Sequence, residues 1–499
     1  MAGDRRWRDG DDRWKTDREV GMSAWDDDGL EWIDEEKYLQ EWDENLIYRE
    51  RQEKERGEEP KRRKKRKDSR KQKSKRKWKI LKVISTCTLM FFMSIIGYAG
   101  YYLEKKVPDQ ISIVADQEEK FFLGLPIRSM LVSDSAEVAI GNGSNIPSDA
   151  IKLDKNDTVS LYSEQLGSYR LGLHLFGMQV KEIQVDVVKE QQVIPCGLPV
   201  GIYLKSDGVM VIGTGEIINS MGEVEEPALG ILKSGDYIRT VNGIEVTTQD
   251  DLFEALEKNG KEQAKLGILR DQEQMTVNLD PVEAEDGKYK LGVWVREDTQ
   301  GIGTVTYVDQ NGGFGALGHG ISDSDTGEVV QIVDGTLYNT EIMGIEKGKV
   351  GNPGVMSGVI YYGNQSKIGN INKNTPCGIF GTVNNKFKRR WQGEKVELGF
   401  KQEIEKGAAT ILSAVSGELK EYDIEILKID TNASNNNKGL VIKVTDPALL
   451  ELTGGIIQGM SGSPIIQNNK LVGAVTHVFV NDPTRGYGIF IENMLEAAE

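Results

Sequence analysis

Cysteine and histidine are scarce in this chain, and their scarcity excludes several kinds of site. The 499 residues include only three cysteines and three histidines. Cys87, Cys196 and Cys377 contain no CxxC spacing and are too few for a disulfide framework. Whether Cys196 and Cys377 bond depends on their distance in the fold, which the sequence leaves open. With so few candidate ligands, we expect no metal site and no cofactor.

A positive overall charge is also missing, which argues against a nucleic-acid partner. The formal net charge is −16, whereas nucleic-acid-binding domains are usually basic. The basic residues concentrate in residues 61–82, KRRKKRKDSRKQKSKRKWKILK. Because an apolar run follows directly, we interpret this block as a juxtamembrane segment that faces an anionic membrane surface.

The acidic arm at residues 1–60 has no long apolar stripe, so we expect it to be disordered or marginally helical. Its scattered tryptophans could dock a partner, or the arm could be a solvated tail. Residues 83–103 carry no charge and cover roughly 30 Å as a helix, which is one bilayer core. The positive-inside rule then places the N-terminus in the cytoplasm and all later residues across the membrane. We expect an uncleaved signal anchor rather than a cleaved signal peptide, with later release by proteolysis within residues 104–120 left open.

Short alternating runs between residues 110 and 190 predict a small β-rich spacer domain. Residues 193–282 resemble a PDZ domain, through PALGILKSGDYIRTVNGIEV and the helical pattern TTQDDLFEALEKNG. In that interpretation Leu198, Pro199, Val200 and Gly201 form the loop that binds a peptide carboxylate. The ligand could be a substrate tail, an inhibitor or this chain's own N-terminal segment.

Residues 287–499 are rich in glycine and β-branched residues, with frequent turn signals, which is typical of a sandwich or barrel. One glycine-framed site is Gly459-Met-Ser461-Gly-Ser-Pro. It resembles the nucleophile loop of chymotrypsin-like peptidases, with Ser461 as the nucleophile. The main-chain N–H groups of Gly459 and Ser461 would then form the oxyanion hole.

A serine nucleophile needs a base, and His319, between two glycines, is the best candidate. His174 precedes the PDZ-like segment, and His477 lies in the apolar strand pattern AVTHVFV. The order of histidine before serine is that of chymotrypsin-like enzymes. The elbow motif of the α/β-hydrolases, by contrast, fails at Ser463.

The base in turn needs an orienting carboxylate. Asp446, in TDPALL, is the first choice, and Asp323 and Asp325 remain candidates because they follow His319 closely.

Three segments together carry a family resemblance: GALGHGISDSDTG, TDPALL and QGMSGSPIIQNNKLVGAVTHVFVNDPTRGYGIFIE. They resemble the stage IV sporulation protein B peptidases, from about Leu81 to the C-terminus. The resemblance implies a mainly β protein with a transmembrane helix, a small β-rich domain, a PDZ domain and a chymotrypsin-like double β-barrel. It also implies that His319, Asp446 and Ser461 are the catalytic residues of a serine endopeptidase.

The resemblance further implies a role in endospore formation. A member of this family is exported into the space between the two forespore membranes and released there by self-cleavage. It cleaves a regulatory membrane protein that restrains an intramembrane metalloprotease, which leads to activation of the late mother-cell sigma factor. The alternative from the residues alone is a catalytically inert, membrane-tethered PDZ adaptor.

Overall fold

The computed structural model describes residues 68–122, 151–153, 158–175, 178–391, 393–433 and 435–499. The arm predicted at residues 1–60 and the start of the basic block lie outside the described residues. By its contacts the chain forms two compact units, residues 1–90 and 91–499.

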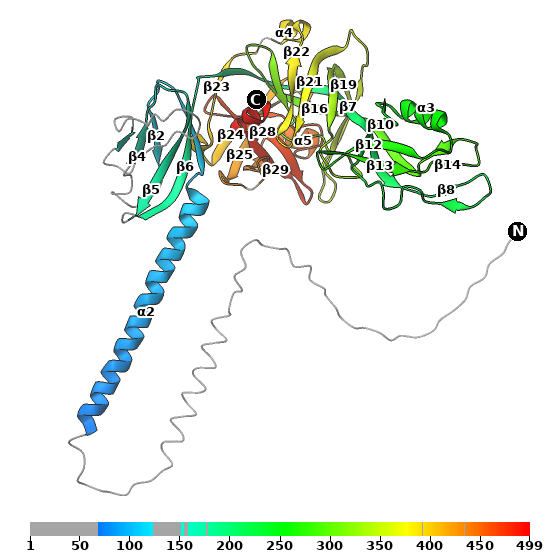
Figure 1. Cartoon of the computed structure of the whole chain (residues 1–499). Helices are drawn as coiled ribbons and strands as arrows, with labels where there is room; N and C mark the ends of the chain where they lie inside the picture. Colours follow the sequence, from blue (N-terminus) through cyan, green and yellow to red (C-terminus); the bar gives the residue numbers. More distant parts are fainter. Residues whose placement is uncertain (1–67, 123–150, 154–157, 176–177, 392, 434) are drawn as a thin grey trace, which may run out of the picture. The chain divides into compact units, whose positions relative to one another are not determined.

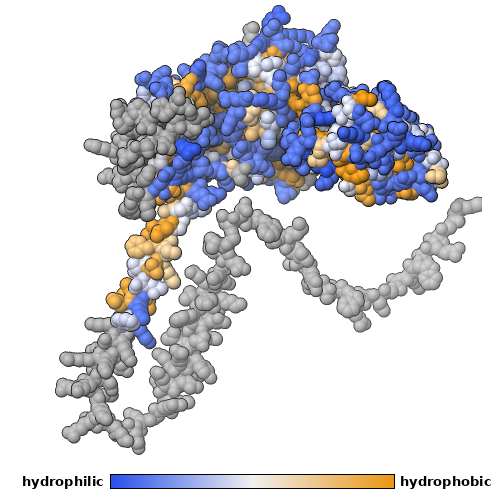
Figure 2. Space-filling model, viewed as in Figure 1, coloured by the Kyte–Doolittle hydropathy of each residue, from blue (hydrophilic) through white to orange (hydrophobic). Residues whose placement is uncertain are grey.

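The first described element is the long helix α2 (Asp68–Lys106), which contains the predicted anchor (Figure 1). Its segment Trp78–Lys105 is long and apolar enough to cross a membrane. Its large apolar side chains are exposed, and Figure 2 shows them as an orange band along the helix. The hydroxyls of Thr86 and Thr88 donate to main-chain carbonyls four residues earlier, at 2.9 and 2.8 Å. These hydroxyls are thus satisfied within the helix, as a bilayer requires.

The region predicted as a β-rich spacer forms two small sheets, in the orders β1-β6-β5 and β2-β4-β3. The alternating side chains of β5 and β6 bury Leu171, Leu173 and Ile183. The strands are β1 (Gln110–Val114), β2 (Glu119–Phe122), β3 (Ile151–Leu153), β4 (Thr158–Leu161), β5 (Gly167–Leu175) and β6 (Met178–Val188).

The first of two barrels is a closed ring of antiparallel pairs in the order β7-β16-β17-β22-β21-β18, and β18 pairs back onto β7. Its centre is filled by aliphatic residues such as Leu204, Leu337 and Ile379. The strands are β7 (Gln192–Thr214), β16 (Val293–Val308), β17 (Gly313–Ala316), β18 (Ile332–Tyr338), β21 (Lys367–Thr375) and β22 (Gly378–Val383). The hairpin β19 (Thr340–Glu346) and β20 (Val355–Ile360) and the helix α4 (Asn385–Arg390) accompany this barrel.

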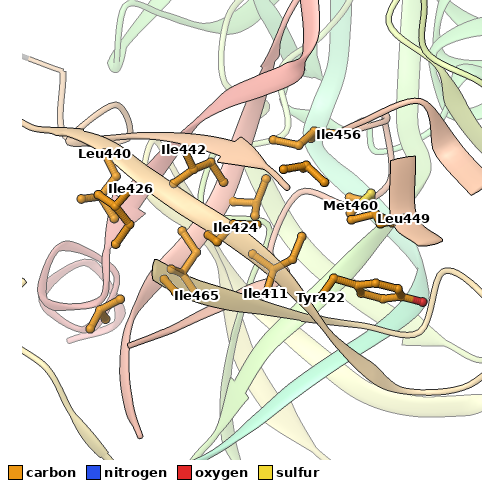
Figure 3. Close-up of a cluster of buried hydrophobic side chains, with 14 of the residues drawn as sticks. Ile411, Tyr422, Ile424, Ile426, Leu440, Ile442, Leu449, Ile456, Met460 and Ile465 are labelled. Atoms are coloured by element: carbon orange, nitrogen blue, oxygen red, sulfur yellow. The ribbon is translucent and has the colours of Figure 1, made fainter. Parts of the chain in front are cut away.

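The second barrel closes in the order β24-β25-β26-β29-β28-β27. Figure 3 shows its core, in which side chains such as Ile411, Ile426 and Ile442 are fully buried; each contributes about 1.5–3 kcal/mol to stability. Its elements are β24 (Gly407–Ser413), β25 (Lys420–Ile429), β26 (Leu440–Val444), α5 (Pro447–Thr453), β27 (Pro464–Gln467), β28 (Lys470–Phe479), β29 (Asp482–Phe490) and α6 (Ile491–Ala498). The short elements β23 (Val396–Leu398) and η1 (Lys401–Glu403) precede it. The predicted double β-barrel is confirmed.

A separate small domain is inserted between β7 and β16, and we call it the insert. Its core includes Val209, Ile238, Leu252 and Ile268. Its elements are β8 (Ile217–Ile218), β9 (Val224–Glu225), β10 (Tyr237–Val241), β11 (Ile244–Glu245), α3 (Gln249–Asn259), β12 (Ala264–Arg270), β13 (Glu273–Leu279), β14 (Val282–Glu283) and β15 (Tyr289–Lys290).

The helix of the insert begins and ends where its sequence indicates. Thr248 and Asp251 form a capping box, and Gly260 ends α3 with φ +62°. The hydrogen bonds that Asp251 accepts from Thr247 and Thr248 lower its pKa to about 2.

The predicted carboxylate-binding loop is wrong. Leu198, Pro199, Val200 and Gly201 lie inside β7 and pair with β16, and Gly201 also pairs with β18. A strand whose main chain is paired in this way has no nest of free N–H groups for a carboxylate. Gly201 instead permits close packing, because a Cβ there would lie 2.5 Å from Ile360 Cγ2. The two domains share these strands, because the first part of β7 packs in the barrel core and the start of β16 packs in the core of the insert.

The open question about the cysteines is also settled. Cys196 and Cys377 are buried and both are free thiols. Burial raises the pKa of Cys196 to about 12, so this thiol stays protonated and packs as a small apolar side chain.

Candidate active site

Two glycine-framed loops, one from each barrel, meet at a shared pocket. The loop with His319 follows β17, and the loop with Ser461 precedes β27. Both residues line a cavity of about 450 Å³. The structure thus brings together the predicted base and the predicted nucleophile. Other lining residues come from the same two barrels: Ile302, Leu317, Ile456, Gly459, Thr476 and His477.

A sharp turn presents His319 to the pocket. Leu317 and Gly318 both have φ +70°, a conformation that few residues other than glycine adopt. A Cβ on Gly318 would lie 2.8 Å from Ile489 Cγ2, so a side chain does not fit there. The Nδ1 atom of His319 lies 2.8 Å from the carbonyl oxygen of Gly320. Because a carbonyl can only accept, Nδ1 carries the proton and Nε2 carries the lone pair.

The charge state of His319 suits a general base. Burial lowers its pKa, and the hydrogen bond to the Gly320 carbonyl offsets part of this effect. The imidazole is therefore neutral at pH 7, and its Nε2 can accept a proton.

Ser461 is held in place by a main-chain acceptor. Its Oγ donates to the carbonyl oxygen of Thr476 at 2.6 Å. Within the described residues no hydrogen bond joins Ser461 to His319. Oγ must therefore leave Thr476 before its proton passes to His319, a rearrangement that substrate binding commonly brings about.

The predicted oxyanion donors, the N–H groups of Gly459 and Ser461, make no hydrogen bond within the described residues. The carbonyl that precedes Gly459 accepts from the N–H of Met356 at 2.9 Å. The carbonyl that precedes Ser461 accepts from the N–H of Ser463 at 2.9 Å. In a trans peptide the N–H points away from the C=O, so the N–H groups of Gly459 and Ser461 point away from these partners. Neither N–H has an acceptor in the part of the chain that the structure describes.

Thr304, a residue that the sequence analysis missed, anchors this loop from the other barrel. It is buried in β16; its N–H donates to the carbonyl of Ser461 at 3.0 Å, and its Oγ1 donates to the carbonyl of Gly459 at 2.8 Å. Gly462 packs directly against it, because a Cβ on Gly462 would lie 2.0 Å from the Thr304 carbonyl oxygen. A threonine in a strand carries no sequence signal for such a role.

Asp446 lies at the start of α5 and caps it. Its Oδ1 accepts from the N–H of Leu449 at 2.9 Å, Pro447 occupies the first turn, and Gly454 ends the helix with φ +74°. The residue does not line the pocket, and among the described residues no hydrogen bond joins it to His319. An orienting role for Asp446 therefore stays a prediction.

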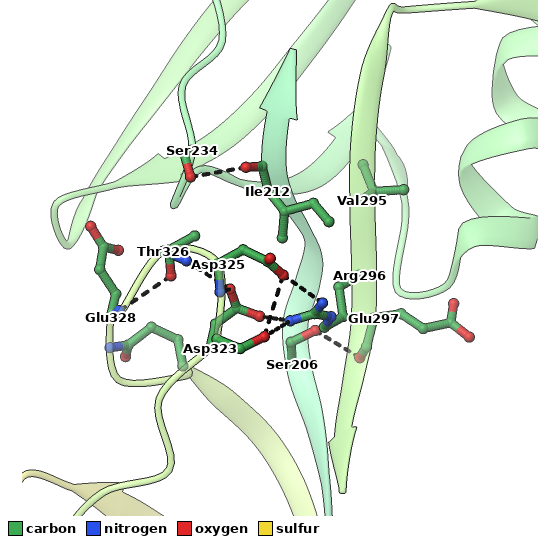
Figure 4. Close-up of polar contacts among 12 residues, drawn as sticks. Ser206, Ile212, Ser234, Val295, Arg296, Glu297, Asp323, Asp325, Thr326 and Glu328 are labelled. Atoms are coloured by element: carbon green, nitrogen blue, oxygen red, sulfur yellow. Dashed lines mark hydrogen bonds and ion pairs between the residues drawn. The ribbon is translucent and has the colours of Figure 1, made fainter. Parts of the chain in front are cut away.

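The other two candidate carboxylates are engaged elsewhere. Asp323 is buried and forms an ion pair with Arg296, and Asp325 lies 2.7 Å from the same guanidinium (Figure 4). Asp323 also accepts from the N–H groups of Asp325 and Thr326 at 2.9 and 3.0 Å. The structure thus places both carboxylates on Arg296 rather than on the base.

A second histidine lies in the pocket. The rings of His477 and His319 have centroids 4.8 Å apart and are tilted by 36°. Burial, together with the charges of His319 and Lys438, lowers the pKa of His477 to about 4. His174 lies in β5 of the spacer. No group of three or more His, Cys, Asp or Glu that could hold a metal occurs in the described residues.

Comparisons with known proteins find a family match for the C-terminal residues. Residues 287–495 match the family model described as SpoIVB peptidase S55. The match is to the family that the sequence resembles, and the chain is a serine peptidase, as the sequence predicted. A solved structure of the Rv3671c protease from M. tuberculosis, in its active form, is 13% identical, covers 40% of this chain and 73% of its own chain, and has a TM-score of 0.24. No curated protein matched.

Proposed function

We propose that this chain is a membrane-anchored serine endopeptidase with Ser461 as nucleophile and His319 as general base. The observation that carries the proposal is the pocket in which both side chains meet, with the Nε2 lone pair of His319 available. The alternative of an inert adaptor explains neither the free N–H groups of the loop nor the neutral imidazole.

The chemistry follows from these positions. Ser461 Oγ leaves the Thr476 carbonyl and attacks the scissile carbonyl carbon while its proton passes to Nε2 of His319. The developing oxyanion accepts hydrogen bonds from the N–H groups of Gly459 and Ser461, a contribution worth about 3 kcal/mol per donor in other serine peptidases. The imidazolium then gives its proton to the leaving amine, and water hydrolyses the acyl enzyme by the same path in reverse.

The finer function rests on the family match and the anchor helix. We propose that the enzyme acts in endospore formation, with its N-terminus in the cytoplasm and its catalytic domain between the forespore membranes. Its substrate would be a regulatory membrane protein that restrains an intramembrane metalloprotease, so that cleavage activates the late mother-cell sigma factor. The basic residues 61–82 would face the anionic membrane surface.

Self-cleavage after the anchor belongs to the same proposal. The strand β1, which follows α2, is part of the folded spacer: Ile111 and Ile113 are buried, and β1 pairs with β6. Asn432 also donates to the carbonyls of Glu104 and Val107, at 2.8 Å each. A cut within Gln110–Val114 therefore requires β1 to leave its sheet first.

The insert is proposed to act as a PDZ-like peptide receptor. An apolar groove of about 900 Å³ lies between α3 and the start of β16, lined by Leu252, Leu256, Val293 and Trp294 among others. A peptide could add as a strand beside β16 there. The occupant could be the chain's own N-terminal segment, an inhibitor protein or a substrate tail.

The test uses the full chain purified in detergent, as wild type and as Ser461→Ala and His319→Ala. A fluorophosphonate probe should label only Ser461 of the wild type, and labelling should be lost in both variants. Mass analysis over time should show shortening at the N-terminal end of the wild type alone. No labelling of the folded wild type would favour the inert adaptor.

A further inference from the structure

An irregularity in β28 lies at the catalytic pocket. In the ladder between β28 and β29, Val475 pairs with Gly488 and Val478 pairs with Gly486. Thr476 and His477 therefore oppose the single residue Tyr487, which is the two-against-one count of a β-bulge. Bulges of this kind redirect side chains and are frequent beside active sites.

The two bulged residues contact the two catalytic residues, one each. The carbonyl oxygen of Thr476 accepts from Ser461 Oγ at 2.6 Å. The ring of His477 packs against the ring of His319, with 4.8 Å between centroids. Thr476 is itself fixed, because its Oγ1 donates to the carbonyl of Asn437 at 2.8 Å.

The contact between the two rings can help to orient His319, because no carboxylate contacts this imidazole among the described residues. The hydrogen bond from Nδ1 to the Gly320 carbonyl fixes the tautomer. One hydrogen bond leaves the ring free to swing about that contact, whereas a flat neighbour restricts its tilt. His477 makes no competing hydrogen bond through Nδ1, which is buried without a partner among the described residues.

His477 can pack in this way without opposing catalysis. Its pKa of about 4 keeps it neutral at pH 7, since burial, His319 and Lys438 all disfavour its charged form. A neutral ring does not repel the imidazolium that forms when His319 takes the proton from Ser461.

We propose that the Thr476–His477 bulge is a positioning element of the active site, in which Thr476 holds Ser461 at rest and the ring of His477 holds the imidazole of His319. The inference rests on the proposed function of Ser461 and His319. His477 is a positioning residue here, because it acts through the base.

The test compares three variants of the full chain in detergent. His477→Ala removes the ring, and His477→Phe keeps a flat ring without nitrogens. His174→Ala is the matched control, in the spacer. With a peptide substrate we expect His477→Ala to lower kcat about 10- to 100-fold with KM changed less than about twofold, because a misplacement of about 1 Å costs that much. His477→Phe should stay within about threefold of the wild type, as should the control.

A second readout needs no activity. The chain has three histidines, so imidazole NMR signals of the Ser461→Ala protein can be assigned by single substitutions. His477→Ala admits water and should raise the pKa of His319 toward its ordinary value, whereas His477→Phe should leave it lowered.

The outcomes separate the two claims. A wild type that is not labelled by the fluorophosphonate probe refutes the proposed function, while the NMR titration still decides whether the ring packs on His319. An active wild type with unchanged rates and titration in His477→Ala overturns the inference alone. Equal losses in the Phe and Ala variants also overturn it, because the nitrogens would then matter rather than the ring.

Discussion

Replacing Asp446 by asparagine separates two roles that its carboxylate could have. In the structure, Oδ1 of Asp446 accepts from the N–H of Leu449 and caps α5, the helix that leads to the nucleophile loop. Asparagine caps helices about as well as aspartate. If capping is the task, Asp446→Asn should keep both stability and activity, within about threefold in kcat. Asp446→Ala should lose the cap, at a cost of about 1 kcal/mol in unfolding free energy.

An orienting role gives a different magnitude. An amide in place of the carboxylate of a catalytic triad lowers kcat about 10⁴-fold, because it favours the wrong tautomer of the histidine. That loss corresponds to about 5 kcal/mol in the activation barrier. The kcat values expected for Asp446→Asn under the capping role and under the orienting role therefore differ by more than three orders of magnitude.

The assay is single-turnover labelling of Ser461 by a fluorophosphonate, beside urea unfolding of each variant. Asp446→Ser serves as a control, because serine keeps a capping oxygen without a carboxylate or an amide. A loss of more than about 10³-fold in Asp446→Asn, at unchanged stability, would refute the capping interpretation. It would show that the chain rearranges to bring Asp446 to the base.

Three further predictions concern the same loops. Thr304→Val should leave the Gly459 carbonyl without its partner, at a cost of about 1–3 kcal/mol, and Thr304→Ser should restore it; urea unfolding and probe labelling measure both. Gly462→Ala places a Cβ 2.0 Å from a Thr304 main-chain oxygen and should prevent normal folding. The control Gly417→Ala has φ +89° but open space around it, so it should lower the unfolding free energy by only about 1–3 kcal/mol. Thermal melting compares the two variants. Burial lowers the pKa of His319, so as the pH falls the unfolded chain binds a proton at this residue before the folded chain does. Unfolding free energy should therefore fall as the pH drops from about 6.5 toward the pKa of the folded state. For the same reason kcat/KM should have its acid limb below about 6.5.

The sequence predicts the elements whose signals are local. The uncharged run 83–103 predicts a helix, and Thr248 to Gly260 predicts both ends of α3. The glycines around His319 and Ser461 predict loops that leave space for a substrate and let main-chain N–H groups turn inward, because glycine has no side chain. These features depend on neighbours within a few positions, so no knowledge of the fold is needed.

What the sequence does not reveal depends on strand register. His477 lies in an apolar strand pattern, and only the bulge opposite Tyr487 turns it toward His319. Asp323 follows His319 closely in sequence but pairs with Arg296 of β16. Such contacts join residues whose separation along the chain carries no signal, so spacing alone cannot rank the candidate carboxylates.

The prediction of a carboxylate-binding loop at Leu198–Gly201 was also wrong because sequence does not reveal strand pairing. An apolar pattern with a central glycine fits a peptide-binding loop and a barrel strand equally well. In the structure these residues form a barrel strand. The paired strands β7 and β16 extend from the barrel into the insert. The start of β16, at Val293 and Trp294, lines the groove of the insert, and Thr304 on the same strand holds the carbonyls of Gly459 and Ser461. A peptide bound in that groove therefore contacts the strand that holds the loop of Gly459 and Ser461 through Thr304.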